Sequence, residues 1–129
     1  GQVCKVANQI LVGTMTSGVA EALLFASKSG ASPEMVRTAL LGGAAQSIIL
    51  ENHGQRMIDR NFDPSFRADL QCKDLGLAVE ACKEVAKYLP GATATWQLFK
   101  QCIAGGDGSN DAISVLKTLE KMAGYELKK

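Results

Sequence analysis

The chain has 129 residues, of which 47% are hydrophobic and 21% are charged, so it is long enough to bury one substantial core. Fourteen basic and thirteen acidic side chains give a formal net charge of +1. This balance excludes the strongly basic surface that nucleic acids or anionic membranes attract. Aromatic residues make up only 5% of the chain, and β-branched residues form no alternating runs, so the composition favours helices.

The first predicted helix covers residues 2–28, where apolar positions recur at helical intervals. Gly13 and Gly18 each weaken a helix by about 1 kcal/mol relative to alanine, which indicates close packing of a neighbour there. Its apolar stretch is interrupted by Thr14, Thr16 and Glu21, among others. We therefore expect a buried core helix and no membrane span.

The second predicted helix begins with Ser32 as its cap and Pro33 at its first position, and ends at 41. Four more helices are predicted at 45–60, 67–89, 93–104 and from about 110 onwards. Pro90 should end the fourth, Ser109 or Asn110 should cap the last, residues 105–108 should be a flexible linker, and residues 126–129 should be frayed. The prediction is an all-α bundle of six helices in one domain, with Leu70, Leu75, Leu77 and Ala78 on the inner face of the fourth.

Cysteine and histidine are too sparse and too scattered to predict a metal site or a disulfide framework. Cys4, Cys72, Cys82 and Cys102 form no C-x-x-C pair, and His53 is the single histidine. We expect His53 to be an ordinary exposed or core histidine, and the four cysteines to be reduced thiols in a cytoplasmic protein.

Lys5, Asn8 and Gln9 form the first candidate site. On a helix they fall at i, i+3 and i+4, so an ammonium group and two amides share one face. A lysine without a nearby acid in sequence, beside an apolar stretch, is expected to be partly desolvated, which favours its neutral form and proton exchange near neutral pH. Spacing alone favours the other interpretation, a solvated lysine at a helix start.

Phe66, Lys73 and Asp74 belong to a second candidate site at a predicted loop-to-helix junction. An aromatic ring, a basic group and a carboxylate in this arrangement can bind an anionic ligand. The alternative is an ordinary i, i+4 ion pair between Asp69 and Lys73 on a solvated helix. The residue pattern alone leaves both open.

The two motifs together resemble the β-hydroxyacid dehydrogenase family, which includes 3-hydroxyisobutyrate dehydrogenase and tartronate semialdehyde reductase. Residues 1–9 are similar to the family signature G-x-x-x-K-x-x-N-N, with Gln9 in place of the last asparagine. The run D-R-N-F-D-P-S-F-R-A-D-L-Q-C-K-D-L-G-L-A is similar to the second conserved block. The resemblance covers essentially the whole chain.

The resemblance implies a role for each candidate residue. Lys5 matches the catalytic lysine, a general acid and base for the carbonyl or hydroxyl oxygen of the substrate. Asn8, Gln9 and Asp74 match substrate-binding positions, and Lys73 and Phe66 match cofactor-binding positions. The implied cofactor is NAD or NADP, and the implied substrate is a small β-hydroxyacid or its semialdehyde. Because Gln9 is one methylene longer than the asparagine of the family signature, we do not expect it to make the same atomic contacts as that asparagine.

The resemblance also implies a domain organisation. Residues 1–129 would be the helical C-terminal domain, as in 6-phosphogluconate dehydrogenase, and would follow an N-terminal Rossmann domain that holds most of the cofactor site. The chain begins within the lysine motif, so we expect it to be part of a longer enzyme and inactive alone. We also expect a homo-oligomer, built partly on the long first helix with Gly13 and Gly18 and on the apolar region around Trp96, which should pack in the core or at an interface. The competing interpretation is a non-catalytic helical dimerisation or interaction domain.

Overall fold

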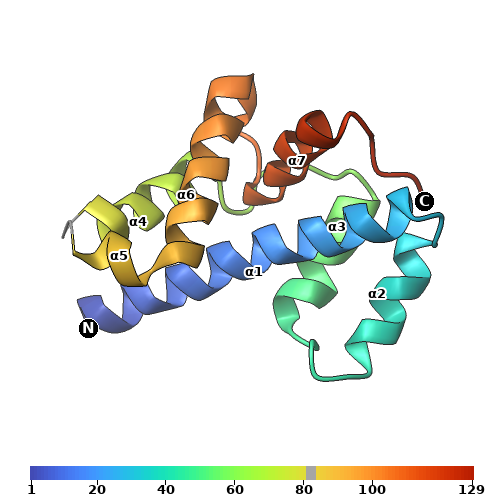
Figure 1. Cartoon of the computed structure of the whole chain (residues 1–129), viewed down its shortest axis with the longest axis horizontal. Coiled ribbons are helices and arrows are strands. Elements are labelled where there is room, and N and C mark those ends of the chain that lie inside the picture. Colours follow the sequence, from blue (N-terminus) through green and yellow to red (C-terminus); the bar gives the residue numbers. More distant parts are fainter. Residues whose placement is uncertain (81–83) are drawn as a thin grey trace.

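A long central helix organises the molecule. The computed structural model describes residues 1–80 and 84–129, without the side chains at 85 and 86. Helix α1 (Gln2–Lys28) runs the length of the molecule, with α2 (Pro33–Leu41) on one side and α3 (Gly54–Ile58) crossing behind it. On the other side lie α4 (Ala68–Glu80), α5 (Val85–Tyr88), α6 (Pro90–Cys102) and α7 (Val115–Ala123) (Figure 1).

Three short turns complete the fold: the π-helical turns η1 (Ile49–His53) and η2 (Ile103–Asp107), and the 3₁₀ turn η3 (Ala112–Ser114). The predicted all-α bundle is confirmed. The first two helices end where the sequence predicted, and the Ser32 hydroxyl accepts a hydrogen bond from the Met35 amide at 3.3 Å. Strong local signals thus set these bounds.

Several predicted helix boundaries were wrong. The third helix begins at Ile48, and the segment before it is turn and irregular backbone. Pro90 is the first helical residue of α6. A backbone amide at this position has no acceptor within the helix, so proline breaks no helical hydrogen bond there. The predicted linker continues α6 as η2, with the left-handed φ of 95° at Gly106. Asp111, and neither Ser109 nor Asn110, caps the last helical segment through the Ile113 amide.

The predicted fourth helix corresponds to α4 and α5, and its residues 81–83 lie outside the described part of the chain. Its predicted inner face is half correct. Leu75 and Ala78 are buried, whereas Leu70 and Leu77 are 44% and 56% exposed. The polar residue Gln71 is buried on this inner face instead. The periodicity of apolar residues cannot predict a buried polar side chain.

The core lies where α1 meets α3, α4, α6 and α7. Fully buried side chains from each of these helices fill it: Leu23, Met57, Ile58, Leu75, Phe99 and Leu116. The predicted close packing at α1 holds for Gly13, where an added Cβ would lie 3.2 Å from a Leu75 methyl carbon. It fails for Gly18, which has open space around it.

Helix α1 is long and apolar enough to cross a membrane, with a mean hydropathy of 1.5 in its most apolar window. However, 44% of that window is buried inside the fold, and the buried face contains the polar side chains Thr16 and Ser17. We therefore assign α1 as the central core helix.

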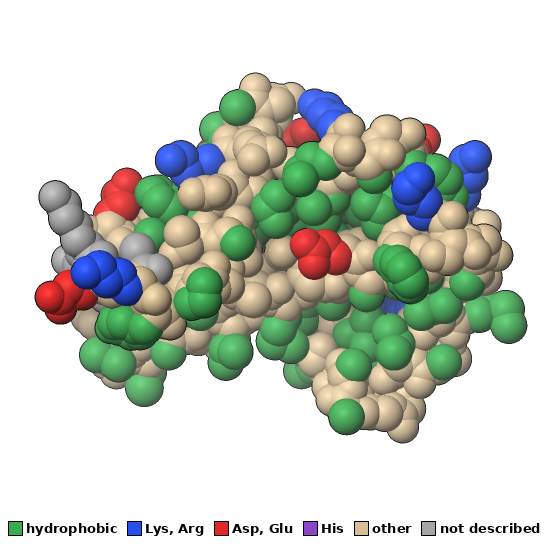
Figure 2. Space-filling view, viewed as in Figure 1, with side chains coloured by type: hydrophobic (Ala, Val, Ile, Leu, Met, Phe, Trp, Pro, Cys, Tyr) green, Lys and Arg blue, Asp and Glu red, His purple; other side chains and the backbone are tan. Residues whose placement is uncertain are grey.

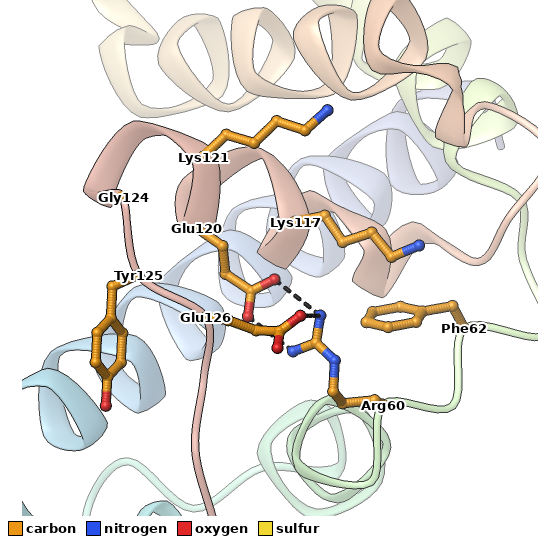
Figure 3. A pocket seen from close by; sticks show the side chains of 8 residues that line it. All are labelled: Arg60, Phe62, Lys117, Glu120, Lys121, Gly124, Tyr125 and Glu126. Carbon is orange, nitrogen blue, oxygen red and sulfur yellow. Dashed lines mark hydrogen bonds and ion pairs between the residues drawn. The ribbon is translucent and has the colours of Figure 1, made fainter.

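The C-terminal tail is anchored, so the predicted fraying was wrong. Leu127 is buried, and its amide donates to Glu120 Oε2 at 2.7 Å. The Lys128 amide donates to the Ser27 hydroxyl at 3.0 Å. The Arg60 guanidinium donates two hydrogen bonds, of 2.7 and 3.0 Å, to the same Glu120 carboxylate (Figure 3). This bidentate bond raises the pKa of Arg60 above its ordinary value despite partial burial.

Candidate functional site

The first candidate site lies at the N-terminal end of α1, where it packs against α4. Lys5, Gln9 and Gly13 follow one another at intervals of four residues, which places them along one face of the helix. The Gln9 amide nitrogen donates to Asp74 Oδ2 on α4 at 2.8 Å. The Gln9 amide oxygen accepts from Asn8 Nδ2 at 3.2 Å. The fold thus joins residues that are 65 positions apart.

A small cavity of about 60 Å³ joins the predicted catalytic lysine to this pair. Its lining comes from both helices: Gln2, Lys5, Val6, Gln9, Asp74 and Leu77. Lys5 itself is exposed. The expected partial desolvation of Lys5 is therefore wrong for this chain, although the apolar Val6 and Leu77 line the same cavity.

The side chain of Gln9 connects Asn8 and Asp74. Its amide nitrogen reaches the Asp74 carboxylate and its oxygen holds the Asn8 amide, so the group links both neighbours. Since a carboxylate has two oxygens with several acceptor positions, this single bond fixes Asp74 and leaves most of its capacity open. The arrangement can orient a carboxylate beside a lysine without neutralising it.

Lys73 and Phe66 do not line this cavity. Lys73 is exposed and makes no ion pair with the described residues. The alternative Asp69–Lys73 pair is absent among those residues, because the Arg67 guanidinium takes both Asp69 oxygens, at 3.1 and 2.6 Å. Phe66 is half-buried in the loop before α4, and its amide is bound by Asp111.

The chain fits part of a dinucleotide site. The exposed ammonium group of Lys73 lies next in sequence to Asp74 and is available for a phosphate. The Lys5 cavity of about 60 Å³ is far below the roughly 300 Å³ at which ligand pockets begin. These residues can therefore present charged groups to a nicotinamide cofactor, but the Lys5 cavity by itself is too small to enclose it.

An apolar groove of about 380 Å³ adjoins the lysine cavity and shares three lining residues with it, Gln2, Val6 and Leu77. Val3 and Tyr88, which also line it, are 83% and 67% exposed. Figure 2 shows hydrophobic side chains protruding at this end of the molecule, where the chain begins. Contiguous apolar surface of this kind is typical of a protein–protein or interdomain contact.

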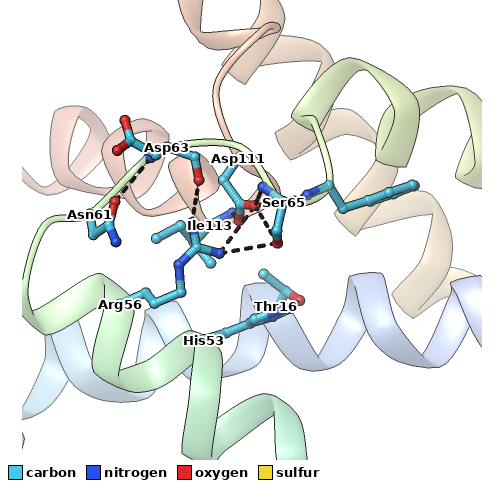
Figure 4. Close-up of polar contacts among 9 residues, drawn as sticks. Thr16, His53, Arg56, Asn61, Asp63, Ser65, Asp111 and Ile113 are labelled. Carbon is cyan, nitrogen blue, oxygen red and sulfur yellow. Dashed lines mark hydrogen bonds and ion pairs between the residues drawn. The ribbon is translucent and has the colours of Figure 1, made fainter.

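Sequence reasoning missed Asp111, the centre of a polar cluster at the loop before α4 (Figure 4). Its side chain is 1% exposed and accepts from the backbone amides of Ser65, Phe66 and Ile113, at 2.8 to 3.0 Å. The Ser65 hydroxyl and Arg56 Nη1 also bind it, each at 3.1 Å. The position of Asp111 before a helical segment could have indicated a helix cap. Its partners Ser65 and Phe66, however, lie 46 and 45 residues away in the sequence.

The Asp111 carboxylate is stabilised in its charged form. Burial acts to raise its pKa, but the three backbone hydrogen bonds and Arg56 outweigh burial, and the pKa lies below the ordinary value of 3.8. Arg56 also donates to the Asp63 carbonyl, so it ties the loop that carries Phe66 to α3. This cluster has the character of a structural hub, since its acceptors are occupied from within the chain.

His53 lies beside this hub and is half-buried, as a structural histidine would be. Its Nδ1 is 3.4 Å from the Thr16 hydroxyl. Burial lowers its pKa below 6.5, Asp111 acts in the opposite direction, and Arg56 adds to the lowering.

The cysteines outside the undescribed segment are free thiols, namely Cys4, Cys72 and Cys102, while Cys82 falls among the residues that are not described. Burial raises the pKa of Cys102 to about 11. Within residues 1–80 and 84–129, no three His, Cys, Asp or Glu side chains gather as metal ligands would. Trp96, predicted to pack in the core or at an interface, is half-buried against the core beside Gly76, where an added Cβ would lie 3.1 Å from the indole nitrogen.

Comparison with known proteins points to one family. A family model described as NAD-binding of NADP-dependent 3-hydroxyisobutyrate dehydrogenase matches residues 1–119. The 2-hydroxy-3-oxopropionate reductase of Escherichia coli (strain K12) is 50% identical over 127 residues, which are 98% of this chain and 44% of that protein. A probable mitochondrial 3-hydroxyisobutyrate dehydrogenase-like protein of Arabidopsis thaliana is 34% identical over 95% of this chain and 36% of its own length.

Solved structures agree with the sequence relatives. A 3-hydroxyisobutyrate dehydrogenase from Salmonella typhimurium superposes with a TM-score of 0.80 and 28% identity, over 89% of this chain and 40% of that one. The chain thus spans less than half the length of the relatives it matches. The match over residues 1–119 and the shared helical fold confirm the resemblance seen in the two motifs: the chain belongs to the 3-hydroxyisobutyrate dehydrogenase family.

Proposed function

We propose that the chain is the lysine-bearing C-terminal half of an NAD(P)-dependent oxidoreductase. The parent enzyme would transfer a hydride between the nicotinamide and a small β-hydroxyacid or its semialdehyde. One observation carries the proposal: Lys5, Gln9 and Asp74 line a single cavity in a chain that is 50% identical to a 2-hydroxy-3-oxopropionate reductase.

Lys5 would act as general acid and base. During reduction, its ammonium group donates a proton to the carbonyl oxygen of the substrate as hydride reaches the carbonyl carbon. In the oxidation direction, the neutral amine accepts the hydroxyl proton. The exposed amide of Asn8 is free on one side to hold a substrate oxygen, and Gln9 fixes Asp74 next to the lysine.

The nicotinamide would supply or accept the hydride, and this chain would contribute charged contacts around it. Lys73 would bind a phosphate of the dinucleotide, and Phe66 would line the edge of the cofactor cleft. Because the cavity at Lys5 is too small to enclose a dinucleotide, we infer that a separate Rossmann domain of the parent protein holds most of it.

The Rossmann domain would also complete the active site physically. The apolar groove next to the lysine cavity offers Val3, Leu77 and Tyr88 as a contact surface. Covering this groove would exclude water from Lys5 and supply the desolvation that the isolated chain lacks. The chain alone would therefore be inactive.

A homo-oligomer built partly on the long first helix also belongs to this proposal, although Gly13 packs within the chain and Trp96 lies beside Gly76. The apolar side chains that remain exposed on α1 and on the α2–α3 side are better candidates: Leu11, Phe25, Met35 and Ile48. Light scattering of the chain at micromolar concentration tests this, and a monomer would contradict it. A cytoplasmic location stays a prediction.

Substitution of the lysine in the full-length parent protein tests the catalytic role. We expect Lys5→Ala to lower kcat by about a hundredfold or more, the usual contribution of a positioned acid or base, while NAD(P)H binds as before. Lys121→Ala is the matched control, because Lys121 is exposed on α7 and far along the chain from the site. Unchanged turnover in Lys5→Ala would overturn the assignment.

A further inference from the structure

Gln71 is a polar residue in an apolar contact between α1 and α4. Its side chain is completely buried. Its amide nitrogen donates to the backbone carbonyl of Gln9 at 3.4 Å, which is a long hydrogen bond. No donor among the described residues reaches its amide oxygen. Such a group destabilises a core, so stability does not explain why an amide stands here.

The contact with Gly13 shows how closely Gln71 fits. A Cβ added to Gly13 would lie 3.0 Å from the Gln71 nitrogen and 3.2 Å from a Leu75 methyl carbon. Real Cβ atoms rarely approach neighbours this closely, so the absence of a side chain at Gly13 makes room for Gln71. The two residues define one relative placement of the helices.

The same placement determines the geometry of the lysine cavity. Gln71 and Asp74 are three residues apart, on one face of α4. Gln71 binds the backbone of Gln9, and Asp74 binds its side chain. Gln9 is therefore held at two points, one helical turn after Lys5. A shift or rotation of α1 along α4 would break both bonds and move the lysine.

We propose that Gln71 is a positioning residue, which fixes the register of α1 on α4 and so holds Lys5 and the Gln9–Asp74 pair in their working arrangement. This inference rests on the proposed function. Gln71 touches neither substrate nor cofactor; it acts through Gln9. The buried amide lowers the stability of the fold, and its role in fixing the position of α1 on α4 explains its presence.

The test replaces the amide with an apolar group of similar length in the full-length protein. We expect Gln71→Met to lower kcat at least tenfold, to leave the KM for NAD(P)H within twofold, and to leave the melting temperature unchanged or higher. A residue with a purely structural role would give the opposite pattern, a lower melting temperature with kcat retained. The matched control is Gln97→Met at an exposed position on α6, which should change neither quantity. Unchanged kcat in Gln71→Met would overturn the proposal.

A double variant separates this inference from the proposed function. If Gln71 acts through the lysine, Gln71→Met should cause no further loss in a Lys5→Ala background, and an additive loss would overturn the inference. A normal rate in Lys5→Ala alone would instead overturn the catalytic role of the lysine. If Gln71→Met does not fold, Gly13→Ala crowds the same contact from α1 and should lower kcat with KM for NAD(P)H retained; unchanged kcat there would also overturn the inference.

Discussion

Two buried or half-buried carboxylates show a clear contrast: Asp74 in the middle of α4, and Asp111 beside the loop that precedes α4. Asp74 receives one side-chain hydrogen bond, from Gln9, and faces a small cavity. Asp111 receives three backbone amides, a hydroxyl group and a guanidinium group. A carboxylate whose acceptor positions are filled from within the chain serves the fold, whereas one with open positions can still act on a ligand.

Glu120 belongs with Asp111 in this comparison. It is buried, and it binds Arg60 and the amide of Leu127. Together Asp111 and Glu120 anchor two segments without regular structure, the loop at 61–66 and the C-terminal tail. The end of the molecule around Lys5 has no such network among its described residues and instead presents an apolar groove. Stability is concentrated at one end and the candidate site at the other.

The largest stability effect is expected at the structural hub. Asp111→Asn should lower the free energy of unfolding by about 3 kcal/mol, because it removes the charge from a buried pair and turns an amide group towards N–H donors. Urea denaturation followed by circular dichroism measures the change.

Two matched substitutions sharpen this prediction. Asp63→Asn lies in the same region, at an exposed side chain without described polar contacts, and should have no measurable effect. Asp74→Asn should cost less than about 1 kcal/mol while lowering activity of the full-length protein. A loss of stability at Asp74 as large as that at Asp111 would break the comparison between the two carboxylates.

A smaller effect is expected at the C-terminal anchor. Glu120→Gln should lower the free energy of unfolding by about 2 kcal/mol, since it weakens two charge-assisted bonds from Arg60 and one from Leu127. It should also make the tail accessible to carboxypeptidase. Glu126→Gln is the control, because Glu126 is 72% exposed and meets Arg60 at 3.3 Å. If the two substitutions lowered the free energy of unfolding equally, the burial of Glu120 would contribute nothing to stability.

The smallest effect concerns pH. Burial lowers the pKa of His53 below 6.5 in the folded chain, so the unfolded chain binds a proton first as pH falls. The stability that neutral His53 contributes is therefore complete above pH 6.5 and is lost as pH falls through the lowered folded value. Denaturation of the wild type and His53→Gln across pH 7.5 to 5 measures this. A pH slope that is equally steep in both would contradict it.

The sequence predicted the parts of the fold that depend on near neighbours. The extent of α1 and the Ser32–Pro33 start of α2 follow from periodicity and capping, which act over one or two turns. The predicted boundaries failed near Pro90 and after Cys102, because proline and glycine either end a helix or begin and extend one, depending on what packs around them. Local sequence cannot choose between these outcomes.

For the candidate site, the sequence alone determined which residues to consider. Lys5, Asn8 and Gln9 share a face by spacing, and the two motifs together identified the family. Only the tertiary structure decided that Gln9 bonds to Asp74, that Lys5 is exposed, and that Gln71 occupies the space at Gly13. The physical reason is range: helix periodicity and caps act within a few residues, whereas hydrogen bonding and burial of these groups depend on chain segments about 60 residues apart.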